Sequence, residues 1–475
     1  MPNPADIVEV AVHPALGIAR VGNATDGYFL APEIPGTAAV DTDRFRDPGP
    51  AGEAQRVKRQ AVRFRIYATL RSGRKVEITA DDGTIEWRVE IANLKAGWYQ
   101  FNNAMDLGAI ALGAKRRNAA VTGQNRRKLD IRPAEQSISG RDKAGDAFRF
   151  DDGRFHGQPV YLGELRTDTR GRLLFLGGHG VSAALDPNAK PTTFANNDGW
   201  HDDTSDGPVR ATVKIGGVTF EAKPGYVVTA PTNYAPGLFG VVTMDDVIVD
   251  AYIAKGWRAR PATPSFTRDI FPMFDRLAGN QWVNEGMYLL FGHGARLDLG
   301  DEATIRKLAD NAPAARALRA QVLALFRPPH AARPQNAALP TFYGDTYGES
   351  DTVGDVDLSL TPTQYAMLTD WANGNFHADW HGRPRAADFD LLTPDAQVEA
   401  LDRAGLTECL GGPFHPGIEL TWIMRNPLVW EAPYRMALLP GGVAVRQDFG
   451  DELTPARCLA ADGPLRDVGP GALTR

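Results

Sequence analysis

The residues with the clearest chemical potential lie in one short segment, residues 409–419, which reads Cys-Leu-Gly-Gly-Pro-Phe-His-Pro-Gly-Ile-Glu. Its glycines and prolines favour a tight, irregular path rather than a helix or a strand. The segment therefore predicts a loop that presents Cys409 just after a helix. A thiolate is a nucleophile and a metal ligand, and His415 has the chemistry of a general base or of a third ligand. We expect Cys409, His415 and Glu419 to line the active pocket.

Cys458 is the only other cysteine, so the count excludes a disulfide framework and leaves room for one bridge. Two interpretations of Cys458 stay open. It forms a disulfide or a thiol-based site with Cys409, or its presence is a coincidence. For Cys409 itself the alternative is a small packed side chain beside a structural turn, which is the usual situation of a cysteine outside a disulfide.

A pair of histidines four residues apart, His377 and His381, suggests a metal site, with Asp379 between them. If this segment is helical, both imidazoles share one face and suit a divalent metal. Trp380 and Gly382 indicate a helix end, however, and packed or solvated histidines are the favoured interpretation. We keep His377 and His381 as weak candidate metal ligands.

Four aspartates between residues 198 and 206 form an acidic run with oxygen ligands for a hard cation such as calcium. Their spacing does not fit an EF-hand loop, and aspartates also build turns by binding their own backbone. We favour the structural interpretation. His179, in a Gly-Gly-His-Gly turn, is expected to satisfy backbone groups, and this turn is not a dinucleotide-binding fingerprint. The four aspartates are Asp198, Asp202, Asp203 and Asp206.

The first 260 residues read mainly as strands and loops. Residues 61–68, 75–79 and 85–92 alternate apolar and polar side chains, as half-buried strands do. Residues 209–215 and 218–222 flank two glycines, which predicts a hairpin with a two-residue turn. A β-rich domain over residues 1–260 is therefore expected.

The remaining residues favour helices. Residues 305–326 have apolar side chains at helical spacing up to a Pro-Pro pair. A second helix is expected over residues 361–374, with Thr361 as N-cap, Pro362 at the first position and Gln364 completing a capping box. Thr393 and Pro394 repeat that design. The prediction is an α+β protein with a mainly helical domain over residues 261–475 that carries Cys409.

Bulk properties exclude several classes of protein. The chain has 475 residues, a net charge of −6 and a sequence pI of about 5.9, so it lacks the basic character that nucleic-acid binding needs. No apolar run approaches the ~20 residues that span a bilayer, and no secretory signal is visible at the N-terminus. We expect a cytoplasmic protein without nucleic-acid or membrane partners.

A set of motifs in a fixed order resembles one enzyme family, the L-lysine epsilon-oxidase and glycine oxidase (LodA/GoxA-like) proteins. No single motif is decisive, but together they run through almost the whole chain. They include Gly17-Ile-Ala-Arg-Val-Gly-Asn23, Asn93-Leu-Lys-Ala-Gly-Trp98, Gly177-Gly-His179-Gly180, residues 196–208, Tyr343-Gly-Asp345, Gln364-Tyr365, Trp371-Ala372 and residues 409–419.

The resemblance implies a chemistry and a set of partners. Such enzymes use cysteine tryptophylquinone, in which the cysteine sulfur is bonded to an oxygenated indole, and Cys409 corresponds to that cysteine. They oxidise an amine or amino acid to an aldehyde or oxo acid and release ammonia and hydrogen peroxide. A flavoprotein partner for modifying the tryptophan and a homo-oligomeric state are implied in the same way.

This chain departs from the family pattern at the cofactor. The family's tryptophan lies beyond the cysteine, yet no tryptophan follows Trp430 here, and residues 453–462 carry Cys458 and alanines instead. The family's acidic residue one helical turn before the cysteine is Gly405 here, with Asp402 and Glu408 as the nearest acids. Trp422 or Trp430 remain alternative partners for Cys409.

The sequence therefore predicts a divergent oxidoreductase that acts on an amine or amino-acid-like substrate without a standard cysteine tryptophylquinone. Its candidate site residues are Cys409, His415, Glu419 and Cys458. Two alternatives stay open: a non-catalytic or scaffold homologue that binds a ligand or a flavoprotein, and a metal-dependent enzyme that uses His377 and His381.

Overall fold

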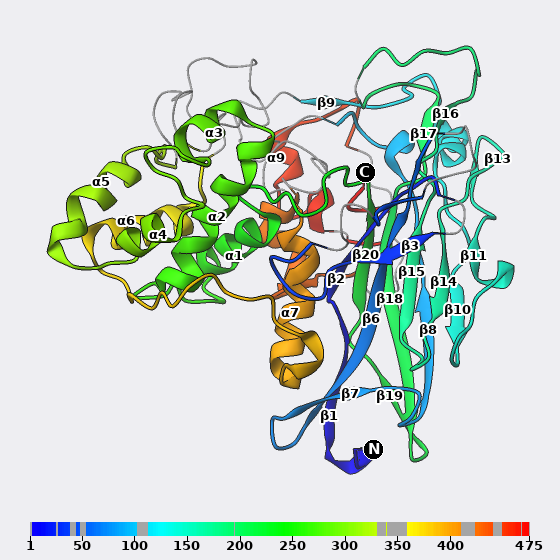
Figure 1. Cartoon of the computed structure of the whole chain (residues 1–475). Coiled ribbons are helices and arrows are strands. Elements are labelled where there is room, and N and C mark those ends of the chain that lie inside the picture. The colour runs from blue at the N-terminus through cyan, green and yellow to red at the C-terminus, as the bar shows by residue number, and fades with distance from the viewer. Residues whose placement is uncertain are drawn as a thin grey trace. The chain divides into compact units, whose positions relative to one another are not determined.

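The computed structural model describes most of the chain and divides it into two compact units (Figure 1). The first unit comprises Met1–Gly237, Ala387–Gly405 and Leu428–Arg475, and the second comprises Leu238–Ala386 and Leu406–Pro427. The described residues are 2–24, 27–38, 44–47, 54–101, 113–193, 195–329, 339, 359–409, 423–439, 449–466 and 468–474.

The first unit is built on a large, mostly antiparallel sheet. Its described strands follow the order β10-β8-β18-β20-β2-β6-β15-β14-β11, with β1, β3 and β7 also paired to β6 and β19 paired to β18. The strands are β1 (Ile7–His13), β2 (Leu16–Arg20), β3 (Tyr28–Leu30), β6 (Arg59–Leu70), β7 (Lys75–Ile78), β8 (Thr84–Val89), β10 (Gln136–Ser139), β11 (Arg149–Phe150), β14 (Gly163–Thr167), β15 (Leu173–Gly177), β18 (Ser205–Ile215), β19 (Val218–Glu221) and β20 (Gly225–Ala230).

Strand β6 organises this sheet, because five other strands pair with it. The alternation expected over residues 61–68 is present, with Phe64 and Ile66 in the main hydrophobic core. The polar face differs from the expectation, however, since Arg65 and Tyr67 are also buried. The face that sequence alternation assigns to solvent is covered here by ion pairs and by helix α7 (Pro394–Thr407).

The predicted hairpin is present between β18 and β19. Gly216 and Gly217 both have positive φ angles, 54° and 84°. This is the combination that a two-residue turn of type I′ requires and that glycine adopts without steric cost. Local turn chemistry therefore set the register of this hairpin, in which Ile215 lies opposite Val218.

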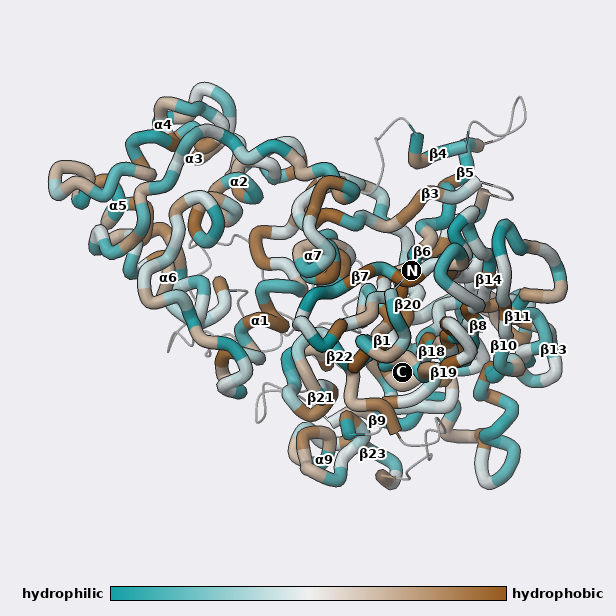
Figure 2. Tube along the Cα trace, turned by 90° about the horizontal axis from the view of Figure 1, so that it is seen from below, coloured by the Kyte–Doolittle hydropathy of each residue, from teal (hydrophilic) through white to brown (hydrophobic). Residues whose placement is uncertain are grey.

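The second unit is helical, with a core of its own around Phe266, Phe274, Leu368 and Trp371. Its helices carry both hydrophobic and hydrophilic positions (Figure 2), and in α2 the buried side chains Phe271, Phe274 and Ala278 recur three or four residues apart, as an amphipathic helix requires. Its described helices are α1 (Met244–Ala254), the π-helical turn η6 (Phe266–Ile270), α2 (Phe271–Gly279), η7 (Asn280–Trp282), α3 (Glu285–Phe291), α4 (Glu302–Leu308), η8 (Pro313–Ala315), α5 (Arg316–Leu323) and α6 (Pro362–Asn373).

Helix starts were predicted well and one helix interior was not. Thr361 and Gln364 form the expected capping box of α6, and Gly374 ends that helix in the left-handed conformation. The single helix expected over residues 305–326 is wrong, because α4 and α5 are separate helices. Pro313 lies between them, where its ring and missing N–H prevent a continuous helix.

The fold class is the expected one, α+β, with a β-rich N-terminal part. The division along the chain is less simple than one boundary near residue 260. Residues 238–260 belong to the helical unit, and residues 387–405 and 428–475 return to the β-rich unit.

Smaller strand pairs of the β-rich unit are β4 (Arg46–Asp47) with β5 (Arg56–Val57), β12 (Arg154–Phe155) with β13 (Gln158–Pro159), β16 (Ser182–Ala184) with β17 (Trp200–Asp202), β21 (Trp430–Ala432) with β22 (Arg435–Met436), and β23 (Glu452–Leu453) with β9 (Ala114–Lys115). Among the described residues, no helix combines the length and the apolar character needed to cross a membrane.

Candidate functional site

Cys409 follows the end of helix α7 directly and is fixed through its backbone. Its N–H donates to the carbonyl of Leu406 at 3.3 Å, and its carbonyl accepts from the N–H of Met244, the first residue of α1, at 2.9 Å. Its side chain is buried. Cys409 lies two residues after the end of α7, as expected, and the rest of the predicted loop lies outside the described residues. His415 and Glu419 lie outside the described residues, so their place beside Cys409 remains a prediction.

The start of α1, which binds the Cys409 carbonyl, is itself strongly organised. Thr243 caps the helix, and its N–H and hydroxyl donate to Asp246 at 2.8 and 3.0 Å. Arg276 in turn donates to Asp246. Asp245, in the same first turn, is buried. Acidic side chains are favourable at this end of a helix, so α1 provides a rigid support for residue 409.

Helix α7 is aligned on the sheet of the first unit by a row of side chains on one face. The Tyr67 hydroxyl donates to Gln397 at 3.0 Å. One turn further on, Asp402 binds residues of β1 and the turn after it. Gly405 faces Ile18, where an added Cβ would lie 3.5 Å from that side chain. The helix that leads to Cys409 therefore has a defined rotation and register.

The most specific of these contacts is a buried chain formed by Asp402, His13 and Arg435. The Nδ1 of His13 lies 2.9 Å from one carboxylate oxygen of Asp402, and the Nη2 of Arg435 lies 3.1 Å from the Nε2 of His13. Arginine can only donate, so Nε2 accepts and the proton of the neutral imidazole sits on Nδ1. Asp402 also accepts from the N–H of Ala15 at 2.6 Å.

These contacts assign Asp402 a structural role. The sequence singled it out as an acid near Cys409, but its carboxylate is committed to His13 and Ala15 in the β-rich unit. Burial lowers the pKa of Arg435, against the charge of Asp402 that raises it. Sequence reasoning did not select His13 or Arg435, because 389 positions separate His13 from Asp402 and no local pattern links them.

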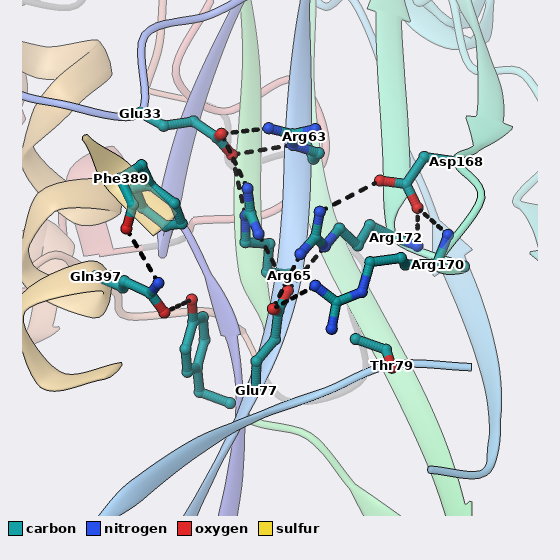
Figure 3. Close-up of polar contacts among 12 residues, drawn as sticks. Glu33, Arg63, Arg65, Glu77, Thr79, Asp168, Arg170, Arg172, Phe389 and Gln397 are labelled. Atoms are coloured by element: carbon teal, nitrogen blue, oxygen red, sulfur yellow. Dashed lines mark hydrogen bonds and ion pairs between the residues drawn. The ribbon is translucent and has the colours of Figure 1, made fainter. Parts of the chain in front are cut away.

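A second polar cluster covers the face of β6 that the sequence alternation assigns to solvent (Figure 3). Glu33 accepts from Arg63 and from Arg65, in the latter case at 3.0 and 2.9 Å. Glu77 accepts from Arg65 at 3.2 Å and from Arg172 at 2.8 and 2.9 Å. Burial alone would raise the pKa of Glu33, but the hydrogen bonds and charges of Arg63 and Arg65 outweigh burial and lower it.

This cluster is a structural network rather than a binding site. Each of these three arginines has a carboxylate partner: Arg63 and Arg65 share Glu33, and Arg65 and Arg172 share Glu77. The guanidinium of Arg65 also stacks on Phe389, 4.5 Å from the ring centroid, and Gln397 donates to the carbonyl of Phe389 (Figure 3). The cluster thereby holds the segment that enters α7.

Cys458 is the last residue of a short helix, α9 (Pro455–Cys458), and is fully buried. Thr454 caps this helix, accepting from the N–H of Arg457 at 3.3 Å. The alanines and Cys458 therefore lie on an ordered turn at the position where the family resemblance placed a tryptophan. A joint site of Cys458 with Cys409 remains a prediction.

The two candidate metal histidines do not share a helical face. Helix α6 ends at Asn373, and His377 pairs with Ser265 in an isolated β-bridge. Asp379, between the histidines, accepts from the hydroxyl of Ser265 at 2.6 Å and from the N–H of Thr267 at 3.0 Å, which caps η6. The helical premise is wrong, and the described part of the chain contains no cluster of three His, Cys, Asp or Glu side chains able to hold a metal.

The acidic run has the structural role that was favoured. Asp198 accepts from the N–H of Asn118 at 2.6 Å, a residue in the left-handed conformation. Asp202 accepts from Asn93 at 2.7 Å and from Lys95 at 3.0 Å. Each carboxylate therefore ties the loop before β18 to a different segment of the first unit.

Asp203 is enclosed by the Gly-Gly-His-Gly turn. The N–H groups of His179, Gly180 and Val181 donate to its buried carboxyl, yet burial dominates and raises the pKa of Asp203 to about 6. The ring of His179 stacks on Tyr161 at 4.8 Å and binds the backbone of Gly22. The expectation that His179 satisfies backbone groups is confirmed.

Asp206 binds the C-terminal tail. Its carboxylate accepts from the N–H and hydroxyl of Thr474 at 2.7 and 2.6 Å and from the hydroxyl of Tyr226. Tyr226 also contacts the carbonyl of Gly469 at 2.7 Å. Burial raises the pKa of Asp206 against these hydrogen bonds, which lower it. Sequence reasoning assigned this aspartate to a turn and missed its long-range partner.

With this geometry in place, comparison with known proteins defines the class. Residues 13–229 match the family model described as L-Lysine epsilon oxidase N-terminal, and residues 344–475 match the L-lysine epsilon oxidase C-terminal domain. The chain belongs to this LodA-like family.

The particular relatives come from Marinomonas mediterranea. The chain is 27% identical over 493 aligned positions to the L-lysine 6-oxidase of this organism, covering 90% of this chain and 64% of that protein. It therefore spans slightly less than two thirds of this relative's length. A crystal structure of the L-Lys epsilon-oxidase of the same organism and a crystal structure of its Schiff base intermediate with L-Lys match at TM-scores of 0.70, with 24% and 25% identity. In both, the match covers 98% of this chain and 73% of that chain.

The residues present do not fit the family cofactor. Its cysteine half is available in Cys409, but the described residues 449–466 contain no indole, and no tryptophan follows Trp430 anywhere in the sequence. Trp430 itself is a buried residue of strand β21, and Trp422 lies outside the described residues.

Proposed function

We propose that this protein is an oxidoreductase that acts on an amine or amino-acid-like substrate and works without the standard cysteine tryptophylquinone. The proposal takes its substrate class from the relatives, which are described as L-lysine oxidases. In the net reaction a primary amine, dioxygen and water give a carbonyl compound, ammonia and hydrogen peroxide. Two electrons and two protons leave the C–H and N–H bonds of the amine and reduce dioxygen to peroxide, and water hydrolyses the resulting imine to the carbonyl compound and ammonia.

One observation carries the proposal. Cys409 keeps an ordered place after α7 and against the start of α1, while the tryptophan that would complete the family cofactor is missing from the sequence. The burial of Cys409 and the hydrogen bonds that fix its backbone favour a chemical role that this cysteine has kept. The redox group is then of another kind, with the thiol of Cys458 and the side chains of His415 and Glu419 as the candidate contributors.

A non-catalytic homologue is the second candidate, and a specific observation favours it. Gly405 occupies the position of the family's acid, and the neighbouring Asp402 is committed to His13. Two parts tied to cofactor formation are thus absent together, as expected if turnover has been lost. Such a protein would bind an amine, an amino acid or a flavoprotein partner without oxidising anything.

Two measurements on the purified full chain separate these candidates. Intact mass with quinone redox staining tests for a modified side chain, and peroxide release over a panel of amines and amino acids tests for turnover. We expect peroxide release with negative quinone staining, and loss of that release in Cys409→Ser. The same panel run on Cys458→Ser shows whether the second thiol takes part.

Each other outcome is informative. A mass increase with quinone staining and a thioether from the Cys409 sulfur to a tryptophan would overturn the quinone-free proposal. Absence of peroxide with every substrate, accompanied by ligand-induced thermal stabilisation, would support the binding homologue instead.

A further inference from the structure

The second unit carries a concentrated apolar surface that its own core does not use. Eleven large hydrophobic side chains are exposed in the described part of the chain, and five of them lie between residues 282 and 290. The other six are scattered over different elements. We call these five residues the 282–290 patch: Trp282 (77% exposed), Val283 (63%), Tyr288 (46%), Leu289 (66%) and Leu290 (48%).

Three of the five patch residues form a second apolar face on helix α3, and Trp282 and Val283 precede that helix. Helix α3 buries Met287 and Phe291, one turn apart, in the core of the second unit. This arrangement leaves the three residues between them, Tyr288 to Leu290, on the outer side. A helix that needs only one apolar face to fold gains nothing in the monomer from a second one.

The patch is also held rigid, which favours a binding role. Asn284 caps α3 by accepting from the N–H of Met287 at 3.0 Å. The side chain of Gln281 accepts from the N–H of His293 at 3.0 Å and donates to the carbonyl of Ala278 at 2.8 Å. These bonds join the two ends of the segment, so a partner would meet a preformed surface at little entropic cost.

The size of the patch matches the apolar part of a protein dimer. With whole-residue areas of roughly 150–250 Å², the exposed fractions add up to about 600 Å². A standard interface buries about 800 Å² on each partner, of which about 450–520 Å² is apolar. The patch alone supplies that apolar area, and it reaches the upper end of the largest patches found on monomers, about 300–600 Å².

The charge of the segment distinguishes between possible partners. Residues 280–292 contain no lysine or arginine, whereas helices that lie on membrane surfaces carry basic residues beside their apolar face. Glu285 is the only charged side chain of the segment. A two-fold contact of the patch with itself therefore buries apolar area and little charge.

We infer that the 282–290 patch is the contact surface between two copies of this chain. Leu289 and Trp282, the two most exposed large side chains of the patch, form the centre of this contact. The inference concerns a surface distant in sequence from Cys409 and holds whether or not the chain has turnover.

Sedimentation of the full chain tests the inference. We expect a dimer for the unmodified chain. Leu289→Glu and Trp282→Glu should sediment as monomers, weakening association by at least tenfold, with unchanged circular dichroism and melting temperature. The matched control is Leu391→Glu, since Leu391 is 83% exposed and lies in the other unit; this variant should remain dimeric.

A second, milder variant guards against misfolding and locates the contact. Leu289→Cys introduces an exposed thiol into a chain whose two natural cysteines are buried, and mild oxidation should cross-link it into covalent dimers. A monomeric unmodified chain, unchanged association in the glutamate variants, or absence of this cross-link would overturn the inference. Binding of the chain to neutral lipid vesicles that Leu289→Glu abolishes would overturn it too, by assigning the patch to a membrane.

Discussion

The imidazole of His13 donates from Nδ1 to the carboxylate of Asp402 at 2.9 Å and joins the end of strand β1 to the middle of helix α7. Both side chains are buried, and Arg435 holds the imidazole from its other nitrogen. Helix α7 leads directly to Cys409. The helix that precedes Cys409 is thus anchored by a residue near the opposite end of the sequence.

Removing the carboxylate from this chain should be costly. Asp402→Ala leaves the Nδ1–H of His13 and the N–H of Ala15 buried without an acceptor, which we expect to lower the free energy of unfolding by about 3 kcal/mol. Asp395→Ala is the matched control on the same helix, because its pair with Lys75 is largely exposed; it should cost less than about 1 kcal/mol. Equal losses in urea denaturation of the two variants would show that the buried chain does not hold α7.

Asp203 should make stability depend on pH. Its pKa is about 6 in the folded protein, raised by burial, against an ordinary value of 3.8. The folded state therefore keeps a proton that the unfolded state releases, so this contribution is complete below pH 4 and is lost as pH rises through 6. Such a difference in pKa is worth about 3 kcal/mol.

The neutral variant Asp203→Asn removes this contribution. Between pH 4 and pH 7 the free energy of unfolding of the unmodified chain should decrease because of Asp203. In Asp203→Asn we expect this decrease to be smaller by up to about 3 kcal/mol, measured by chemical denaturation. Asp202→Asn acts in a different pH range: burial raises the pKa of Asp202, but Lys95 and Thr204 outweigh burial and lower it. The contribution of Asp202 is therefore complete above about pH 4 and is lost only as pH falls below that value. An identical pH profile for the unmodified chain and Asp203→Asn would refute the assignment.

The C-terminal tail should be released when its link to Asp206 is cut. Thr474→Val removes a buried hydroxyl that donates at 2.6 Å, and we expect a loss of about 1–2 kcal/mol. Hydrogen exchange should increase in residues 468–474 and leave the helical unit unaffected. Thr474→Ser, which keeps the hydroxyl, serves as the control; if the two variants exchange alike, the hydroxyl is not the link.

The hairpin turn offers a test of backbone strain alone. Gly217 has a φ of 84° and no atom within 4 Å of an added Cβ, so Gly217→Ala should cost about 1–2 kcal/mol through its left-handed conformation. Gly279 also has open space but no positive φ, and Gly279→Ala should be neutral or stabilising by up to about 1 kcal/mol. Thermal denaturation of the pair would contradict this account if both shifts were the same.

The sequence predicts the features of the fold that depend only on neighbouring residues. The capping box of Thr361 and Gln364 and the glycine turn at 216–217 were readable because all the interacting atoms lie within a few residues. The apolar pattern continues on both sides of Pro313, so it predicts one helix where the structure has two, α4 and α5. His377 and His381 satisfied a helical spacing in a segment that is extended, because Gly374 had already ended the helix.

Long-range chemistry was not readable in the same way. The sequence points to Asp402 only by its nearness to Cys409 and to Asp206 only by its acidic neighbours. Their partners, His13 and Thr474, lie hundreds of positions away. A single sequence contains no signal for such pairs, since neither periodicity nor spacing connects them.

The interleaving of the two units sets a limit on how this protein can be dissected. The chain leaves the β-rich unit at residue 237, returns for residues 387–405, leaves again and returns at residue 428. A fragment ending at residue 237 would contain His13, Arg65 and Asp206 but none of Asp402, Phe389 or Thr474. No single truncation yields either unit intact, so fragments for expression must be designed as insertions or excisions that rejoin the three stretches of the β-rich unit.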